Sequence, residues 1–175
     1  MIRRILNGTV FYQFMRLAQY PEVLHAIFTR IGGTSSGAFH SLNVGHLVGD
    51  QPTAVQANLE LVFRTLGIKP EQVVTARQVH GAHLAVVGAA EQRTVVPATD
   101  SLISSEQGVA LLLRFADCLP LMLYDPLRQV VGLVHVGWRG IIAGVVVNAL
   151  AALRHEYGCN AHDLVAALGP AIGPC

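Results

Sequence analysis

Three residues with metal-binding side chains stand where apolar segments of the sequence end. His80 ends Ala-Arg-Gln-Val-His-Gly, Cys118 lies in Phe-Ala-Asp-Cys-Leu-Pro, and His135 lies in Gly-Leu-Val-His-Val-Gly. Imidazole nitrogen and thiolate sulfur are good zinc ligands, and three protein ligands leave a fourth position open, as in catalytic zinc sites. Such a zinc ion can acidify a bound water or polarise an oxygen. The sequence therefore suggests a catalytic metal site at His80, Cys118 and His135.

The spacing of these residues leaves a structural interpretation open, because no pair has CxxC or HxxxH spacing. A single cysteine is more often a small buried hydrophobe, and a strand histidine is more often a hydrogen-bonded core residue. Asp100 and Asp117 are the carboxylates nearest the apolar runs. Asp117, beside Cys118, either orients a ligand histidine or caps a turn. His83 is expected to face away from His80 and not to bind the metal.

A second group of residues, Trp138-Arg139-Gly140, follows His135 almost directly. A strand is expected to end at His135 and a helix to begin after a glycine turn. Free backbone amides and the positive end of the helix dipole would then favour an anion. Arg139 could add a charge-assisted hydrogen bond to phosphate or to a substrate carboxylate. The alternative is that Trp138 anchors the core and Arg139 is a surface charge, and the sequence favours neither.

Hydrophobic periodicity predicts the elements that must position these residues. Helices are expected over 53–66, with Asp50 as N-cap and Gly67 after its end, and over 140–155. A Gly/Ser/Thr loop covers 30–37. Short apolar runs rich in Val and Leu predict buried strands over 9–13, 23–29, 73–79, 83–87, 109–115, 119–124, 129–136 and 164–168. Strands and two helices alternate, so the expected class is α/β or α+β with a layered mixed sheet.

Composition restricts the class of protein. The chain has 175 residues, of which 52% are hydrophobic and only 13% charged, so we expect one domain over 1–175 with a substantial core. The net charge is +1 without a Lys/Arg cluster, which argues against a nucleic-acid partner. The longest apolar stretch, 141–153, is too short for a bilayer. Three irregularly spaced cysteines argue against a disulfide framework and favour a cytoplasmic location.

Seven segments in order also carry a family resemblance. They are His25-Ala-Ile-Phe-Thr-Arg-Ile-Gly-Gly, Ser41-Leu-Asn-Val-Gly, Gly49-Asp-Gln-Pro-Thr-Ala-Val, Gln78-Val-His-Gly, Ala116-Asp-Cys-Leu-Pro, His135-Val-Gly-Trp-Arg-Gly and Gly169-Pro-Ala-Ile-Gly-Pro-Cys. Together they resemble the motifs of the laccase-domain (YfiH-like) family, whose members are called polyphenol oxidases or purine nucleoside phosphorylases. The resemblance runs from about residue 23 to the last residue.

The resemblance implies a layered α/β fold and a zinc site at His80, Cys118 and His135, with copper as an alternative ion. It implies phosphorolysis of adenosine, inosine and methylthioadenosine to the base and ribose 1-phosphate, and deamination of adenosine. The partners would be small molecules, a nucleoside and phosphate. Arg30 and Asn43 match loop positions expected to line the pocket. The oligomeric state is not indicated.

Two departures from the family pattern accompany the resemblance. Val136 stands where the family usually has alanine, and the chain is shorter than family members, so we expect it to lack a C-terminal part.

Other functions stay open alongside the nucleoside enzyme. A copper-dependent polyphenol oxidase is one, although a multicopper centre needs many histidines, commonly in His-x-His pairs, and none of the 8 histidines forms such a pair. A hydrolase with Cys118 as nucleophile and a histidine base is another. A metal-stabilised binding module without turnover is a third.

Overall fold

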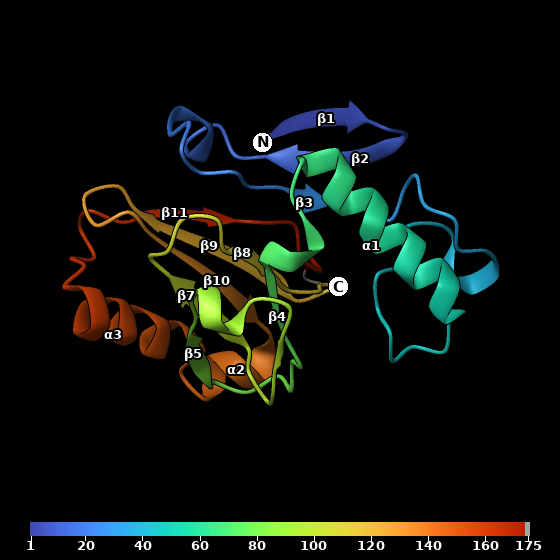
Figure 1. Ribbon diagram of the computed structural model, residues 1–175. Coiled ribbons are helices and arrows are strands. Elements are labelled where there is room, and N and C mark those ends of the chain that lie inside the picture. Colours follow the sequence, from blue (N-terminus) through green and yellow to red (C-terminus); the bar gives the residue numbers. More distant parts are fainter. Residues whose placement is uncertain (174–175) are drawn as a thin grey trace. The chain divides into compact units, whose positions relative to one another are not determined.

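The computed structural model describes residues 1–173 (Figure 1). The chain forms two compact units, Met1–Pro70 and Glu71–Cys175. The expectation of one domain over 1–175 stays a prediction. The last two residues of the motif that begins at Gly169 lie outside the described residues.

In the first unit, strands β1 (Ile2–Leu6), β2 (Thr9–Gln13) and β3 (Ile27–Phe28) form an antiparallel sheet in the order β1-β2-β3. Asn7 and Gly8 join β1 to β2 with positive φ values of 51° and 79°, as a two-residue Asn-Gly hairpin turn requires. Strand β2 matches the strand predicted over 9–13. The strand predicted over 23–29 is restricted to β3, and the apolar pattern does not predict β1.

Helix α1 (Pro52–Leu66) agrees with the helix predicted over 53–66 to within one residue. Its apolar face is buried at the periodic positions Val55, Leu59, Val62 and Phe63. Gly67 ends the helix in the left-handed conformation, with φ 68°. The predicted N-cap was wrong by one position, because Gln51 is the cap and its backbone N–H donates to Asp50 Oδ1 (2.8 Å).

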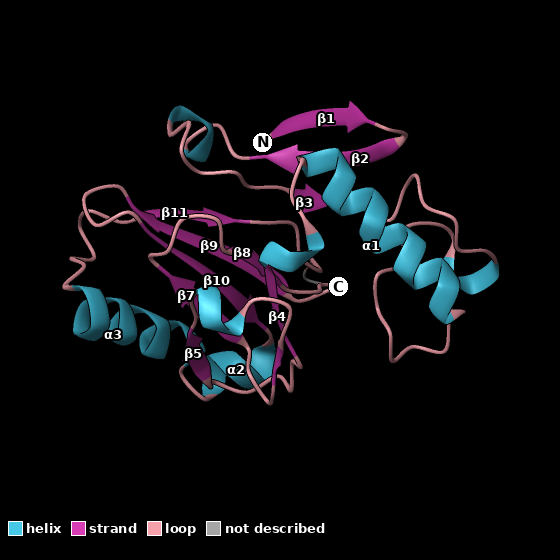
Figure 2. Ribbon diagram, viewed as in Figure 1, coloured by secondary structure: helices cyan, strands magenta, loops and turns pink. Residues whose placement is uncertain are grey.

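The second unit contains a mixed five-stranded sheet in the order β11-β9-β10-β7-β5 and a parallel three-stranded sheet in the order β6-β4-β8 (Figure 2). The strands are β4 (Val73–Ala76), β5 (Leu84–Val86), β6 (Val95–Val96), β7 (Ser101–Ser104), β8 (Ala110–Leu112), β9 (Leu119–Asp125), β10 (Val130–Val136) and β11 (Val165–Leu168). Short 3-10 helices occur in both units: η1 (Leu17–Gln19) and η2 (Gly37–Phe39) lie in the first, η3 (Pro70–Gln72) begins at its last residue, and η4 (Ala89–Glu91) lies in the second. This mixed, layered arrangement confirms the predicted fold class.

The five-stranded sheet is covered on both faces, as alternation along β7 shows. Leu102 packs with Val74 and Ala76 of β4. Its neighbour Ile103 packs with Val145 and Ala149 of the next helix along the chain. Successive residues of β7 therefore face two apolar layers in alternation, one on each face of the sheet.

The helix predicted over 140–155 is two helices, α2 (Trp138–Ile142) and α3 (Val145–Tyr157). Gly144 separates them in the left-handed conformation, with φ 85°, which a continuous helix does not allow. Gly158 ends α3, as predicted. Within residues 1–173, no helix has both the length and the apolar character needed to cross a bilayer.

Candidate metal centre

The fold brings the three predicted metal-binding residues together. Their ligand atoms (one nitrogen of each histidine and Cys118 Sγ) all lie within 4.8 Å of one another. His80 follows β4, Cys118 immediately precedes β9, and His135 lies in β10. Antiparallel pairing of β9 with β10 sets Pro120 opposite His135, so the residue before β9 reaches the same end of the hairpin. The register of two strands thus supplies two of the three candidate ligands.

The three side chains differ in exposure. His135 is buried at 3% exposure, Cys118 is half-buried and His80 is exposed. The His80 ring meets the His135 ring edge-on, with 4.8 Å between centroids, and Phe115 lies 5.5 Å from His135 on the same measure. The cluster is therefore closed on the His135 side and accessible on the His80 side.

Asp100 orients the buried histidine. His135 Nδ1 lies 2.8 Å from Asp100 Oδ1. Burial raises the pKa of Asp100, but hydrogen bonds from His135 and from the amides of Gly81, Val79 and His80 outweigh it, so the pKa is below its ordinary value. An ionised carboxylate only accepts hydrogen bonds, so Nδ1 carries a proton, and in the neutral imidazole it is Nε2 that has the lone pair. Because Nδ1 is bonded to Asp100, Nε2 is the ring nitrogen that remains available to bind a metal ion.

His80 is held in an unusual backbone conformation. Its φ is +60°, in the left-handed region that few residues other than glycine adopt. The amides of Val79 (3.1 Å), His80 (3.0 Å) and Gly81 (2.8 Å) all donate to the Asp100 carboxylate. These three bonds offset the backbone strain at a candidate ligand, which is the kind of residue at which proteins retain such strain.

Cys118 and Gly137 set the space between the ligands. Burial raises the pKa of the Cys118 thiol, and the charges of Asp117 and Asp100 add to the effect. A cation at the site acts in the opposite direction and favours the thiolate. A Cβ atom at Gly137 would lie 3.1 Å from Cys118 Sγ and 3.2 Å from His80 Cδ2. Because Gly137 has φ −85°, the site needs its lack of a side chain for space rather than for conformation.

This donor set fits the ion that the resemblance implies. Two imidazole nitrogens and one thiolate sulfur match the ligands of catalytic zinc sites, which keep a further position open. Copper also binds such ligands, and generally more strongly than zinc. The chemistry of the three side chains therefore accommodates either ion.

The orienting hydrogen bond predicted for Asp117 is made by Asp100 instead. Asp117 is exposed in the bend before β9, whereas Asp100 is fully buried immediately before β7, the strand that pairs with β10. Sequence reasoning missed this role because β7 is not predicted by the apolar pattern. The available signal was a carboxylate next to the buried segment Ser101–Ser104, since a buried charge needs partners.

Arg139 and Trp138 are both exposed, Trp138 at 65%. The alternative in which Trp138 anchors the core is therefore wrong. The Arg139 guanidinium lies over the Trp138 ring, 5.0 Å from its centroid, at the start of the five-residue helix α2. The anion-binding role of Arg139 stays a prediction.

Arg30 and Asn43 belong to the first unit, where both side chains bond within their own loop. The Arg30 guanidinium donates to the carbonyl oxygen of His40. Asn43 Nδ2 donates to Asp50 Oδ2 (2.9 Å), and Asn43 Oδ1 accepts from the amide of Gly45 (3.0 Å). Hydrogen bonds from Asn43 and from a neighbouring serine lower the pKa of Asp50. The predicted pocket role of Arg30 and Asn43 stays a prediction.

Comparison with known proteins identifies the family. Residues 24–175 match the family model described as multi-copper polyphenol oxidoreductase laccase. The chain belongs to this family. Our prediction of a laccase-domain protein is thereby confirmed.

Curated relatives and solved structures agree with this assignment. Purine nucleoside phosphorylase SCO2081 of Streptomyces coelicolor is 44% identical over 86% of this chain and 63% of its own length. Purine nucleoside phosphorylase YlmD of Geobacillus stearothermophilus is 40% identical over 89% of this chain and 60% of its own length. The chain thus spans less than two thirds of these relatives.

Two solved structures have the same fold. The crystal structure of YlmD from Geobacillus stearothermophilus has a TM-score of 0.91 at 34% identity, over 98% of this chain and 65% of that one. The crystal structure of the hypothetical protein YfiH from Bacillus licheniformis has a TM-score of 0.89 at 31% identity, with the same coverage.

Proposed function

We propose that this chain is a zinc-dependent purine nucleoside phosphorylase. It would convert adenosine, inosine and methylthioadenosine, with phosphate, into the free base and ribose 1-phosphate, and would also deaminate adenosine. The observation that carries the proposal is the convergence of His80, Cys118 and His135 within 4.8 Å. The names of two relatives at 44% and 40% identity support the choice of reaction.

In this proposal His80, Cys118 and His135 hold the ion, and His135 does so through Nε2. When bound, zinc supplies a Lewis acid that polarises a substrate oxygen and acidifies water. Asp100 keeps the His135 ring and its proton in place. The exposed side of His80 leaves a direction of approach for the nucleoside.

Phosphate is assigned to Arg139. Its guanidinium presents several N–H donors in a fixed plane, which suits phosphate oxygens. The guanidinium lies over the ring of Trp138, and Arg139 is two residues along the chain from Gly137, where a Cβ atom would meet the ligands Cys118 and His80. Arg30 and Asn43 are proposed as further substrate contacts because they match the family's loop positions. A cytoplasmic location completes the proposal, because a reducing compartment keeps Cys118 available as a ligand.

The description of the family model favours a second candidate, a copper-dependent polyphenol oxidase. One cluster of at least three His, Cys, Asp or Glu ligands occurs in residues 1–173, so the described residues offer a place for a single copper ion. A hydrolase in which Cys118 acts without metal is less well supported, because burial and two carboxylates raise the pKa of its thiol and so reduce the reactive thiolate.

Zinc-loaded protein incubated with adenosine, with and without phosphate, tests the proposal directly. Chromatography is expected to show adenine and ribose 1-phosphate only with phosphate, and inosine in both reactions. Chelator-treated protein should lose both activities and regain them on addition of zinc. Copper-loaded protein with a phenol and oxygen tests the second candidate in parallel.

Two variants complete this test. His80→Ala should lose zinc and turnover together, whereas the matched control His83→Ala should retain both, because the His83 side chain is outside the ligand cluster. A fully zinc-loaded protein that makes no product from any of the three nucleosides would contradict the proposed activity. Phenol oxidation by the copper form alone would put the second candidate in its place.

A further inference from the structure

Asp100 connects the two histidines of the candidate site through both its backbone and its side chain. Its backbone N–H donates to the carbonyl of His83 (3.0 Å), and its carbonyl accepts from the backbone N–H of His135 (2.8 Å). Its carboxylate adds a bond to the His135 ring. A single residue with an exposed fraction of 0% thus joins the His80 turn to β10.

The Asp100 carboxylate has all its acceptor capacity in use. Two carboxylate oxygens accept about four hydrogen bonds. Oδ1 accepts from His135 Nδ1 and the amide of His80, and Oδ2 accepts from the amides of Val79 and Gly81. Three of these donors belong to the turn that carries one histidine, and the fourth is the ring of the other histidine. The placement of each ring therefore depends on the same two oxygen atoms.

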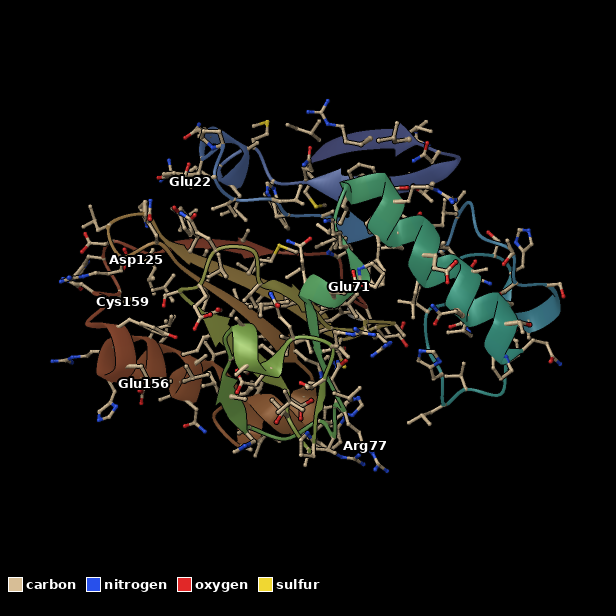
Figure 3. The ribbon with its side chains drawn as sticks, viewed as in Figure 1. Glu22, Glu71, Arg77, Asp125, Glu156 and Cys159 are labelled. Carbon is tan, nitrogen blue, oxygen red and sulfur yellow. The ribbon has the colours of Figure 1, made fainter. Side chains whose placement is uncertain are left out.

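A buried carboxylate that accepts backbone amides can serve the fold alone, and the same unit contains such a case. Asp125, with an exposed fraction of 1%, accepts from the amides of Leu127 (2.9 Å) and Arg128 (3.0 Å) in the turn after β9. Figure 3 shows Asp125 beside Cys159. Asp125 is the last residue of β9, at the opposite end of the strand from Leu119 and the preceding Cys118. Asp125 closes a local turn and contacts none of the candidate ligands.

We propose that Asp100 is a positioning residue that fixes His80 and His135 relative to one another before the metal binds. This inference rests on the metal site of the proposed function. Partners that orient ligand histidines contribute to metal affinity because the ligands then need no rearrangement on binding. Asp100 differs from an ordinary partner of this kind because it orients one ligand ring directly and holds the backbone of another.

Asparagine has almost the same shape as aspartate, so Asp100→Asn changes the hydrogen bonds of this side chain with almost no change in its size. The asparagine NH₂ group donates and does not accept, so in the place of Oδ2 it would face the N–H groups of Val79 and Gly81. Rotated by half a turn, it would face those of His135 and His80 instead. In the first orientation the His80 turn loses two of its three bonds, and in the second the His135 ring and the amide of His80 lose theirs. Asp100→Glu keeps the charge but displaces it by one methylene.

The test measures the affinity of the full chain for Zn²⁺ by competition with a chromophoric chelator, together with the visible absorption spectrum of the Co²⁺ form. Asp100→Asn is expected to bind zinc about 10- to 100-fold more weakly and to show altered Co²⁺ ligand-field bands. The matched control, Asp125→Asn, should lower thermal stability while its zinc affinity and Co²⁺ spectrum stay at the wild-type values.

The outcomes distinguish the inference from the proposed function. Wild-type zinc affinity and Co²⁺ spectrum in Asp100→Asn would overturn the positioning role and leave the metal site standing. An equal loss of affinity in Asp125→Asn would also overturn it, because general destabilisation would then explain both. A wild-type chain that binds neither ion would overturn the metal site itself. If Asp100→Asn does not fold, Asp100→Glu decides: weakened zinc binding supports the positioning role, and unchanged binding contradicts it.

Discussion

The β9–β10 hairpin has a buried carboxylate associated with each end, and the two ends use that carboxylate differently. At the turn, the Asp125 carboxylate accepts from amides 2 and 3 positions further along the chain, and the Cys159 thiol is a further partner. At the other end, Asp100 bonds residues 19 to 35 positions away. The turn is thus completed by local geometry, whereas the candidate metal site depends on segments that only the tertiary fold brings together. Substitutions at the turn should therefore change stability, and substitutions at the site should change metal binding.

The largest effect that sharpens this comparison is expected for Gly137→Ala. The added methyl would lie 3.1 Å from Cys118 Sγ and 3.2 Å from His80 Cδ2, and overpacking of this kind costs about 1–3 kcal/mol. The extended backbone at Gly137 accepts alanine, so the cost falls on the ligand geometry. Zinc affinity should fall about tenfold or more, as measured by chelator competition.

Gly132→Ala is the control for that variant, because it adds a methyl within β10, 3.3 Å from Leu123 Cβ, away from the ligands. It should lower the melting temperature and leave zinc affinity unchanged. A Gly137→Ala protein that binds zinc like the wild type would show that the three ligands have more space than their distances indicate.

A pH-dependent effect is expected at the turn end. Burial and the neighbouring Asp125 raise the pKa of Cys159 to about 12, whereas an unfolded cysteine ionises near pH 8.5. Above pH 8.5 the unfolded state releases a proton that the folded state keeps. The thiol's contribution to stability is therefore complete below that pH and is lost as pH rises toward 12, by about 1.4 kcal/mol for each pH unit.

Urea unfolding at pH 7.5 and 9.5 measures this effect. The stability of the wild-type chain should fall more steeply with pH than that of Cys159→Ala, and the difference between the two slopes isolates Cys159 from Cys118. Parallel slopes would show that Cys159 titrates normally in the folded chain. Cys159→Ala should bind zinc like the wild type, since Cys159 is outside the ligand cluster.

The same contrast between local and distant interactions explains what the sequence could predict. The positions of His80, Cys118 and His135 at the ends of apolar runs suggested a group of ligands without excluding structural roles, and the family resemblance made the metal site the prediction. Helix α1 was predictable from its periodicity and Gly67. Asp100 was not, because its partners lie in segments whose proximity depends on the order of β5, β7 and β10 in the sheet.

Two further elements show the limits of predicting structure from the pattern of apolar residues. Gly144 interrupts what reads as one continuous apolar helix, since a glycine within a helical pattern does not by itself reveal a left-handed φ. Strand β7 has serine at both ends, so its four buried residues resemble a loop in sequence. The strand that places Asp100 beside β10 was for this reason missing from the predicted elements.

The smallest expected effect concerns Ser101, the chain neighbour of Asp100. Both residues have an exposed fraction of 0%, yet alternation along β7 directs Ser101 to the face of Ile103, toward the helical layer. Among the described residues, Ser101 Oγ has no hydrogen-bond partner. An unpaired buried hydroxyl costs about 1–3 kcal/mol of desolvation, and a methyl group in its place carries no such cost.

Ser101→Ala should therefore leave stability unchanged or raise it by up to about 1 kcal/mol, measured by urea unfolding, with unchanged zinc affinity. Asp100→Asn changes the adjacent residue and should lower both stability and zinc affinity, because it replaces one of the two oxygens that four donors share. A marked loss of stability in Ser101→Ala would mean that the hydroxyl has a partner after all. Ser101 would then take part in a hydrogen bond as Asp100 does, and the contrast between a residue that serves the metal site and a neighbour that serves packing would be wrong.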